Sequence, residues 1–277
     1  MPELPEVETI AHGLHCAVAG ARISAVHVTR PDVLREVDAR MLVRRVRGAG
    51  IVRVWRRAKL VVLELSTADR ILVQPRFTGA MLVAAPDAPL AERDLHYSTV
   101  ELVLEDARSI HYSDVRRLGT FALMDPERFA RYTGALGIEP LDPGFTADHL
   151  SGLLRGSRQS VKKILMDQRG VVGVGNIYAN EALWRAGIDP SRQGRLVTAA
   201  EAARLRDDVV EVLREAIHAR GTSFRDYRDA RGEPGSFVIR LAAYGRAGQP
   251  CLRCGARLVG THAIDGRQTV LCAHCQS

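Results

Sequence analysis

The chain opens with Met1-Pro2-Glu3-Leu4-Pro5-Glu6, the stretch that sets the start of the first helix and organises the N-terminal part. Val7, Ile10 and Leu14 follow at helical spacing, and the acidic residues before them suit the positive end of a helix dipole. We therefore expect a helix that begins within this stretch and buries one apolar face. Cys16, further along the same helix, is expected to be a small buried side chain.

Pro2 gives the same stretch a second, chemical interpretation. Removal of Met1 would leave Pro2 with a free secondary amine, and an α-amino group titrates near ~8, against ~10.4 for a lysine. Such an amine attacks an aldehyde-like carbon to give an iminium ion, which acts as an electron sink. Glu3 and Glu6 place carboxyl groups beside it, where a general acid or base is useful. On the residues alone, a plain helix start and a nucleophilic terminus both stay open.

Composition and charge restrict the class of protein. The 277 residues, 46% of them hydrophobic, suffice for one large or two ordinary domains. No apolar run approaches the ~20 residues of a membrane span, and the N-terminus lacks the pattern of a signal peptide. We expect a cytoplasmic protein without a membrane partner. The net charge of +7 lies almost entirely after residue 140, so that half is the expected polyanion-binding half.

Residues 1–125 continue from the first helix into short β-rich runs separated by turns. The runs cover 22–30, 43–54, 60–65, 70–73, 98–104, 109–112 and 120–124. This pattern is typical of an antiparallel sandwich or barrel rather than of βαβ units. Residues 84–89, Ala-Ala-Pro-Asp-Ala-Pro, are expected to form an exposed loop.

The character of the chain changes after the linker-like segment 139–144. Helical apolar spacing is present in 146–155, 160–168, 177–186 and 198–219, and Thr198 with Glu201 forms a capping-box pattern. The sequence thus predicts an α+β protein: an N-terminal helix with an antiparallel β-sandwich, then a helical domain that ends in a small metal-bound hairpin. The predicted boundaries are 1–135 for the first domain, 136–150 for a linker, 151–236 for the helical domain and 237–277 for the metal module.

Four of the five cysteines form the most specific motif. Cys251 and Cys254 make one CxxC pair, and Cys272 and Cys275 make a second after seventeen intervening residues. Two such pairs at this spacing indicate a tetrahedral zinc site of the ribbon type. Since all four ligands are thiolates, no position stays open for water, and the ion is expected to be structural.

Several segments could bind a polyanion, and each also has a plainer interpretation. Arg267 would lie on the tip of the hairpin between the cysteine pairs, where it suits phosphate or minor-groove contact or is simply solvated. Asn176 begins a helix after the turn 171–175, whose free N–H groups could bind phosphate or merely connect two helices. Segments 56–59 and 114–119 place basic residues at strand ends. Phe77, in loop 74–79, could enter a base stack or a core.

Together these motifs resemble the bacterial formamidopyrimidine-DNA glycosylase family. Members open with Met-Pro-Glu-Leu-Pro-Glu, continue with a helix–two-turns–helix segment containing Val-Gly-Val-Gly-Asn-Ile-Tyr (here 172–178), and close with the two CxxC pairs of a zinc ribbon. The resemblance covers the chain from end to end. Leu4 favours this family over its sister family, endonuclease VIII, which has glycine at that position.

The resemblance implies a monomeric base-excision repair enzyme that acts on damaged double-stranded DNA, associated with the nucleoid in a bacterial cytoplasm. A damaged purine, such as 8-oxoguanine or a formamidopyrimidine, is flipped out of the duplex, Pro2 attacks the sugar C1′, and β- and δ-elimination cut the strand. Glu3 matches the catalytic acid, and Lys59 matches a lysine on the phosphate beside the lesion. Asn176 and Arg267 match a phosphate clamp. The catalytic set is Pro2, Glu3, Lys59 and Arg267, and the cofactor is one zinc ion.

The resemblance also implies supporting and DNA-binding residues. Those expected to support the lesion pocket are Glu6, Lys162, Glu181, Thr222 and Ser223. The last two belong to a segment, 221–224, that matches the loop closing over the flipped base. Besides the clamp, the expected DNA-binding residues are Gln74, Phe77, Arg116, Arg117 and Leu118.

Two loops depart from the family pattern. Where the family reads His-Leu-Gly-Met-Ser-Gly, this chain has Gln74-Pro75-Arg76-Phe77-Thr78-Gly79, so Phe77 replaces the methionine that fills the vacated base stack. Where the family reads Asp-Pro-Arg-Arg-Phe-Gly, residues 114–119 read Asp-Val-Arg-Arg-Leu-Gly, so Leu118 replaces an aromatic wedge. We expect the wedge to be kept, with its aromatic residue moved from the second loop to the first.

Two other functions fit parts of the sequence. A non-catalytic damaged-DNA-binding protein on the same scaffold would not need Pro2, Glu3 and Glu6 together, so their presence favours catalysis. An oxidised-pyrimidine glycosylase of the endonuclease VIII kind would share the terminal amine and differ in the lesion it removes.

Overall fold

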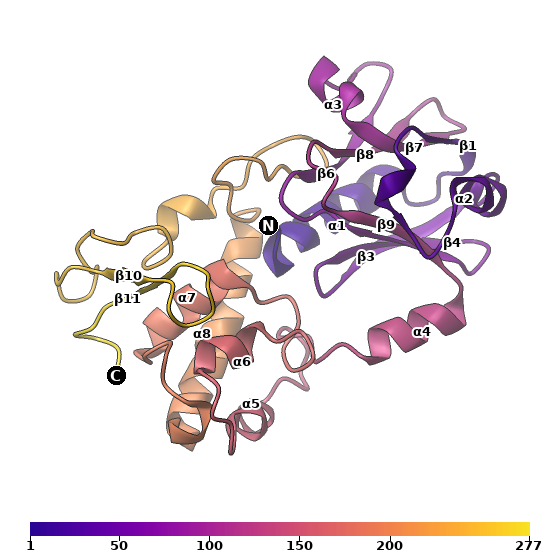
Figure 1. Cartoon of the computed structure of the whole chain (residues 1–277). Helices are drawn as coiled ribbons and strands as arrows, with labels where there is room; N and C mark the ends of the chain where they lie inside the picture. Colours follow the sequence, from indigo (N-terminus) through magenta and orange to yellow (C-terminus); the bar gives the residue numbers. More distant parts are fainter. The chain divides into compact units, whose positions relative to one another are not determined.

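The computed structural model describes all 277 residues, which form two compact units (Figure 1). Unit 1 comprises Met1–Gly134 and Ala219–Ser236, and unit 2 comprises Ala135–His218 and Phe237–Ser277. The α+β class is confirmed, with the main sheets in unit 1 and most long helices in unit 2. The predicted boundaries follow the order of motifs along the chain, whereas the compact units group Ala219–Ser236 with the N-terminal residues. No helix is both long and apolar enough to cross a membrane.

Unit 1 begins with the predicted helix, α1 (Leu4–Val18). Val7, Ile10 and Leu14 are fully buried, which confirms the apolar face predicted from their spacing. The prediction for Cys16 was wrong, because its side chain is exposed. Position 16 lies two residues beyond Leu14 and therefore about 200° around the helix from the buried face.

Two sheets and α1 form the main core of unit 1. One sheet has the order β1-β7-β8-β6 and the other β2-β9-β5-β4-β3, and every paired strand is antiparallel except β2 with β9. The predicted antiparallel sandwich is confirmed. The strands are β1 (Ile23–Val28), β2 (Leu34–Arg35), β3 (Ile51–Arg57), β4 (Leu60–Leu65), β5 (Arg70–Gln74), β6 (Gly79–Ala84), β7 (Ser98–Leu104), β8 (Ser109–Asp114) and β9 (Thr120–Met124).

The predicted β run 43–54 is partly wrong, because its first residues are helical. They belong to α2 (Ala39–Val46), whose N-cap Asp38 accepts a hydrogen bond from Met41 N at 2.8 Å. Leu42 and Val46, four residues apart, bury one face of this helix. Two further helices of unit 1 were not predicted, α3 (Glu92–His96) and α4 (Pro126–Gly134).

Unit 2 contains the four predicted helices, α5 (Ala147–Leu154), α6 (Val161–Met166), α7 (Asn176–Ala186) and α8 (Ala199–His218). The capping box at the start of α8 is confirmed: Glu201 Oε2 accepts from Thr198 N at 2.8 Å, and Glu201 N donates to Thr198 Oγ1. At the end of the chain, β10 (Val259–Thr261) and β11 (Thr269–Leu271) form the predicted antiparallel hairpin (Figure 1).

Candidate active site and nucleic-acid interface

The N-terminus of α1 gathers four predicted groups of unit 1. Glu3 and Glu6 are 3% and 1% exposed, and Lys59, in the turn between β3 and β4, is 7% exposed. Burial lowers the pKa of the Met1 α-amino group; Glu3 and Glu6 oppose this shift, and Lys59 adds to it. All three side chains therefore act on the terminal amine. The shift belongs to the Met1 amine, and Pro2 carries a free amine only once Met1 is removed. Pro2, next to it, is buried.

The Glu6 carboxylate joins two distant parts of unit 1. Its Oε2 accepts a hydrogen bond from Glu3 N at 2.8 Å, and its Oε1 accepts one from Thr222 N, also at 2.8 Å. Gly221, just before Thr222, has φ of +86°, and a Cβ there would come within 2.9 Å of the Glu6 side chain. Glycine is therefore required for the close approach of this backbone to Glu6.

Ser223 stabilises the same segment from within. Its hydroxyl donates to Tyr227 O at 2.9 Å and accepts from Gly235 N at 2.9 Å. The Tyr227 hydroxyl in turn donates to the backbone carbonyl of Arg220 at 3.0 Å. Phe224, which follows Ser223, is 50% exposed. The segment is thus fixed by hydrogen bonds at both ends and presents an aromatic side chain between them.

Two loops that cross between the sheets carry the predicted DNA-binding residues of unit 1. One leads from β5 to β6 and the other from β8 to β9. Gln74, the last residue of β5, pairs with the first residue of β9, and Gly79, the first of β6, pairs with the last of β8. The loops therefore lie side by side. Arg117, in the second loop, donates to Asp32 Oδ2 at 2.8 Å.

The tips of these loops expose apolar side chains. Phe77 is 48% exposed and Leu118 is 40% exposed, so Phe77 is not a core residue. The Arg116 guanidinium lies 5.5 Å from the centre of the Phe77 ring, within cation–π range. Thr78 Oγ1 donates to Asp114 Oδ1 at 2.6 Å and accepts from Arg116 N at 3.1 Å. These bonds fasten one loop to the other.

In unit 2, Gln168 holds the predicted turn between α6 and α7. Its Oε1 accepts from Gly173 N at 2.9 Å, and its Nε2 donates to two backbone carbonyls nearby. Asn176, the first residue of α7, donates from Nδ2 to Gln268 O at 3.0 Å. Asn176 therefore contacts the hairpin that also carries Arg267, whose side chain is exposed.

Two predicted pocket residues of unit 2 are fully buried. Lys162 Nζ donates to Thr269 Oγ1 at 2.7 Å. The Glu181 carboxylate accepts three backbone N–H bonds, at 2.7 to 2.9 Å, from the consecutive residues 242–244. Burial raises the pKa of Glu181, and those three bonds oppose the shift. Lys162 and Glu181 thus contact other parts of unit 2, namely β11 and the segment 242–244. Their part in a lesion pocket stays a prediction.

The four predicted cysteines form the metal site. Their Sγ atoms all lie within 4.8 Å of one another, as the ligands of a tetrahedral ion must. Cys251 and Cys272 are buried and pack with Leu258, Val270 and the partly buried Trp184. Four thiolates suit zinc and leave no ligand position for water, so this cluster holds one structural zinc ion.

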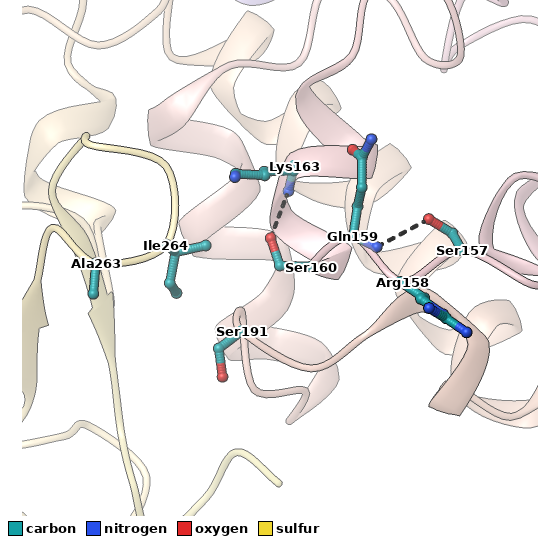
Figure 2. Close-up of a pocket in the computed structure, with 8 residues that line it drawn as sticks. All are labelled: Ser157, Arg158, Gln159, Ser160, Lys163, Ser191, Ala263 and Ile264. Atoms are coloured by element: carbon teal, nitrogen blue, oxygen red, sulfur yellow. Dashed lines mark hydrogen bonds between the residues drawn. The ribbon is translucent and has the colours of Figure 1, made fainter.

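The surface cavity of unit 2 in Figure 2, of about 700 Å³, contains none of the predicted site residues. Its hydroxyl groups serve the local backbone: Ser160 Oγ accepts from Lys163 N, and Ser157 Oγ accepts from Gln159 N (Figure 2). Ser191 donates to Asp189. The three hydroxyl groups are therefore used in local hydrogen bonds of the protein itself.

Several residues have roles in the site that were not predicted from the sequence. Tyr227 and Gln168 position functional segments through backbone hydrogen bonds, and Thr78 ties the two loops. Asp226 acts on the terminal amine, raising its pKa. Thr78 lies in the quoted loop 74–79, but only the fold reveals its bonds to the other loop.

Comparisons with known proteins agree with this geometry. Three family models match: "Formamidopyrimidine-DNA glycosylase N-terminal domain" over residues 1–121, "Formamidopyrimidine-DNA glycosylase H2TH domain" over 136–228, and "Zinc finger found in FPG and IleRS" over 248–277. A formamidopyrimidine-DNA glycosylase of Xanthomonas campestris is 42% identical over 277 residues, and one of Carboxydothermus hydrogenoformans is 38% identical; each comparison covers both chains completely.

Solved structures of a Lactococcus lactis relative share the fold. A mutant of that protein in complex with Fapy-dG containing DNA is 31% identical, with a TM-score of 0.90 and complete coverage of both chains. A complex with abasic-site DNA is 30% identical, with a TM-score of 0.90 over 99% of each chain. The chain therefore belongs to the formamidopyrimidine-DNA glycosylase family: it is a DNA-binding glycosylase of base-excision repair with one structural zinc ion.

Proposed function

We propose that this glycosylase removes oxidised purines, such as 8-oxoguanine and formamidopyrimidines, from duplex DNA and then cuts the strand as a lyase. The lesion class is supported by the names of its relatives and by the Lactococcus complex with Fapy-dG DNA. The observation that carries the lyase is the place of Pro2: it is buried at the start of α1, next to the buried carboxylates of Glu3 and Glu6. A binding protein would gain nothing from an amine so placed.

The first step uses Pro2 as the nucleophile once Met1 has been removed. Its nitrogen lone pair forms a bond to C1′ while the C1′–base bond breaks; the base leaves with that electron pair and takes up the proton that the Pro2 nitrogen gives up. Glu3 then gives a proton to the sugar ring oxygen as the ring opens, which leaves an iminium ion between Pro2 and C1′.

The iminium ion drives the strand cuts. Its positive charge acidifies the C2′ hydrogen, and loss of that proton expels the 3′ phosphate; a second elimination expels the 5′ phosphate. Glu6, by accepting from Glu3 N, holds the acid in place. Thr222 and Ser223 belong to the segment that closes over the flipped base, and Glu6 connects this segment to the same helix.

The DNA-binding roles follow the exposed groups of each unit. In unit 1, Lys59 neutralises the phosphate beside the lesion, Phe77 and Leu118 fill the space left by the flipped nucleotide, and Arg116 supports that wedge. Gln74 and Arg117 flank the wedge. In unit 2, Asn176 and Arg267 clamp a phosphate. Lys162 and Glu181 support the site from buried positions. We also propose that the protein works as a monomer on the chromosome in a bacterial cytoplasm.

Borohydride trapping on an 8-oxoguanine:cytosine duplex tests the proposal, with the N-terminal mass measured on the same preparation. Borohydride reduces the iminium ion to a stable amine, so a covalent adduct that maps to Pro2 is expected. Pro2→Gly replaces the secondary amine with a primary one and serves as the control for the nucleophile. A lyase should lose activity with this change, whereas a binding protein should be unaffected. Retained Met1 should abolish trapping altogether, because it converts the Pro2 nitrogen into an amide.

The other outcomes separate the alternatives. Trapping on an abasic duplex alone keeps the lyase and rejects 8-oxoguanine as the lesion; competing cleavage of a thymine-glycol duplex then tests the endonuclease VIII activity. No adduct on either duplex, with Met1 confirmed absent, means a non-catalytic DNA-binding protein. Glu3→Gln should abolish base release and leave some elimination at a preformed abasic site, and base release near the wild-type rate would show that Glu3 is not the acid.

A further inference from the structure

Two adjacent lysines of α6 lie in opposite environments. Lys162 is 0% exposed, whereas Lys163 is exposed and lines the cavity of Figure 2. A buried ammonium group is costly unless it is paired and hydrogen-bonded. Lys163 carries the same charge without that cost. The partners of Lys162 therefore indicate what its burial achieves.

Those partners lie on the hairpin between the zinc-binding cysteine pairs. Lys162 Nζ donates to Thr269 Oγ1 at 2.7 Å and lies 3.3 Å from the carboxylate of Asp265, whose side chain is only 10% exposed. Asp265 Oδ1 also accepts from Arg267 N at 3.0 Å. One carboxylate thus joins the buried ammonium to the backbone of the exposed arginine.

The rest of the hairpin is tied to unit 2 by neutral bonds. Asn176 donates to Gln268 O at 3.0 Å, and Asn180 Oδ1 accepts from Val270 N at 2.7 Å. Both bonds reach residues after Arg267. On the side of the hairpin that precedes Arg267, α6 is joined to the loop by the ion pair of Lys162 with Asp265. Removing this pair should free the turn that sets the direction of Arg267.

We propose that Lys162 is a positioning residue for Arg267, which it holds through Asp265, and that it does not itself touch DNA. The proposal deepens the proposed function, since it rests on Arg267 binding a backbone phosphate. It makes the supporting role of Lys162 specific: Lys162 supports the zinc hairpin and, through it, Arg267. It also predicts that the effects of Lys162 and Arg267 are coupled, as those of residues within one network are.

A double-mutant cycle on the full zinc-loaded chain tests this. Affinity for a duplex with an uncleavable abasic analogue is measured at several salt concentrations for the wild type, Lys162→Met, Arg267→Ala and the double variant. Each single variant should bind about five- to tenfold more weakly, with a salt slope lower by about 0.9, the value for one phosphate contact. The double variant should bind no more weakly than Arg267→Ala.

The controls separate positioning from other roles. Lys163→Met removes the same charge from an exposed place. Any effect it has on DNA affinity should be independent of Arg267, so the fold-changes of Lys163→Met and Arg267→Ala should multiply in the double variant. Asp265→Asn should behave like Lys162→Met, and it replaces that variant if Lys162→Met does not fold. Effects of Lys162→Met and Arg267→Ala that multiply, with the slope lower by about 1.8, would show direct phosphate contact and overturn the proposal. If Lys162→Met lowers the melting temperature but binds the duplex with wild-type affinity, the role of Lys162 is purely structural and the proposal is overturned. Absence of wild-type binding to the duplex would instead refute the proposed function.

Discussion

Replacing Glu6 with glutamine tests whether one buried carboxylate holds together the two halves of the site in unit 1. The two carboxylate oxygens each accept a backbone N–H at 2.8 Å, one from Glu3 and one from Thr222. A glutamine has one acceptor oxygen, so its NH₂ group must face one of these N–H donors. The lost bond is charge-assisted and only 1% of Glu6 is exposed, so Glu6→Gln should cost about 2–3 kcal/mol of unfolding free energy.

The assay combines unfolding with two activities. Urea unfolding of the zinc-loaded protein should show the loss, and hydrogen exchange at the Thr222 amide should accelerate if that bond is the one lost. Base release should slow at least tenfold, since 1.4 kcal/mol corresponds to a factor of ten. Cleavage of a preformed abasic site should slow less, because it needs no closure over a base.

Glu8→Gln is the matched control on the same helix. The Glu8 carboxylate is 38% exposed and pairs with Arg56 at 2.7 Å, and the amide oxygen of glutamine can still accept from Arg56, so Glu8→Gln should cost less than Glu6→Gln. If Glu6→Gln is as stable as Glu8→Gln and the Thr222 amide stays protected, then Glu6 does not join the helix to the 219–236 segment. The reasoning from the two hydrogen bonds would then be refuted.

Three further outcomes are expected. Phe77→Ala should weaken binding to a lesion duplex by about 1–3 kcal/mol, the worth of one base–aromatic stack, without lowering the melting temperature; equal affinities for wild type and Phe77→Ala would remove Phe77 from the wedge. Zinc chelation, or Cys272→Ala, should weaken DNA binding through loss of the hairpin, and an undiminished affinity without zinc would contradict this. Burial raises the pKa of Asp208 to about 6, above the 3.8 of an ordinary aspartate, so its ionisation destabilises the fold as pH rises through 6. Asp208→Asn should therefore add about 1–2 kcal/mol at pH 7.5, after allowance for solvent screening, and nothing below pH 4, as urea unfolding at both pH values will show.

The features that could be predicted from sequence depend on residues close together in the chain. The apolar stripe of α1, the capping box of α8 and the two cysteine pairs each need fewer than thirty residues of context, and all three are confirmed. The prediction that Cys16 is buried was wrong for a local reason: its angle around α1 places it away from the buried stripe. The bond between Glu6 and Thr222 spans 216 positions, and no pattern within the sequence connects them. The terminal amine and the carboxyl groups of Glu3 and Glu6 beside it could be proposed from the sequence, but the effects of Lys59 and Asp226 on the pKa of the Met1 amine could not.

The pairing of the two loops supports the proposal that the wedge keeps its function while its residues change. Because Gln74 and Gly79 pair with the ends of β9 and β8, the tips of both loops emerge at the same edge of the sandwich. The bonds of Thr78 then lock one tip to the other. A wedge built from the two tips therefore requires an apolar side chain on each loop, with an aromatic one on either of them. Phe77 with Leu118 satisfies this requirement, as methionine with phenylalanine does in the family pattern.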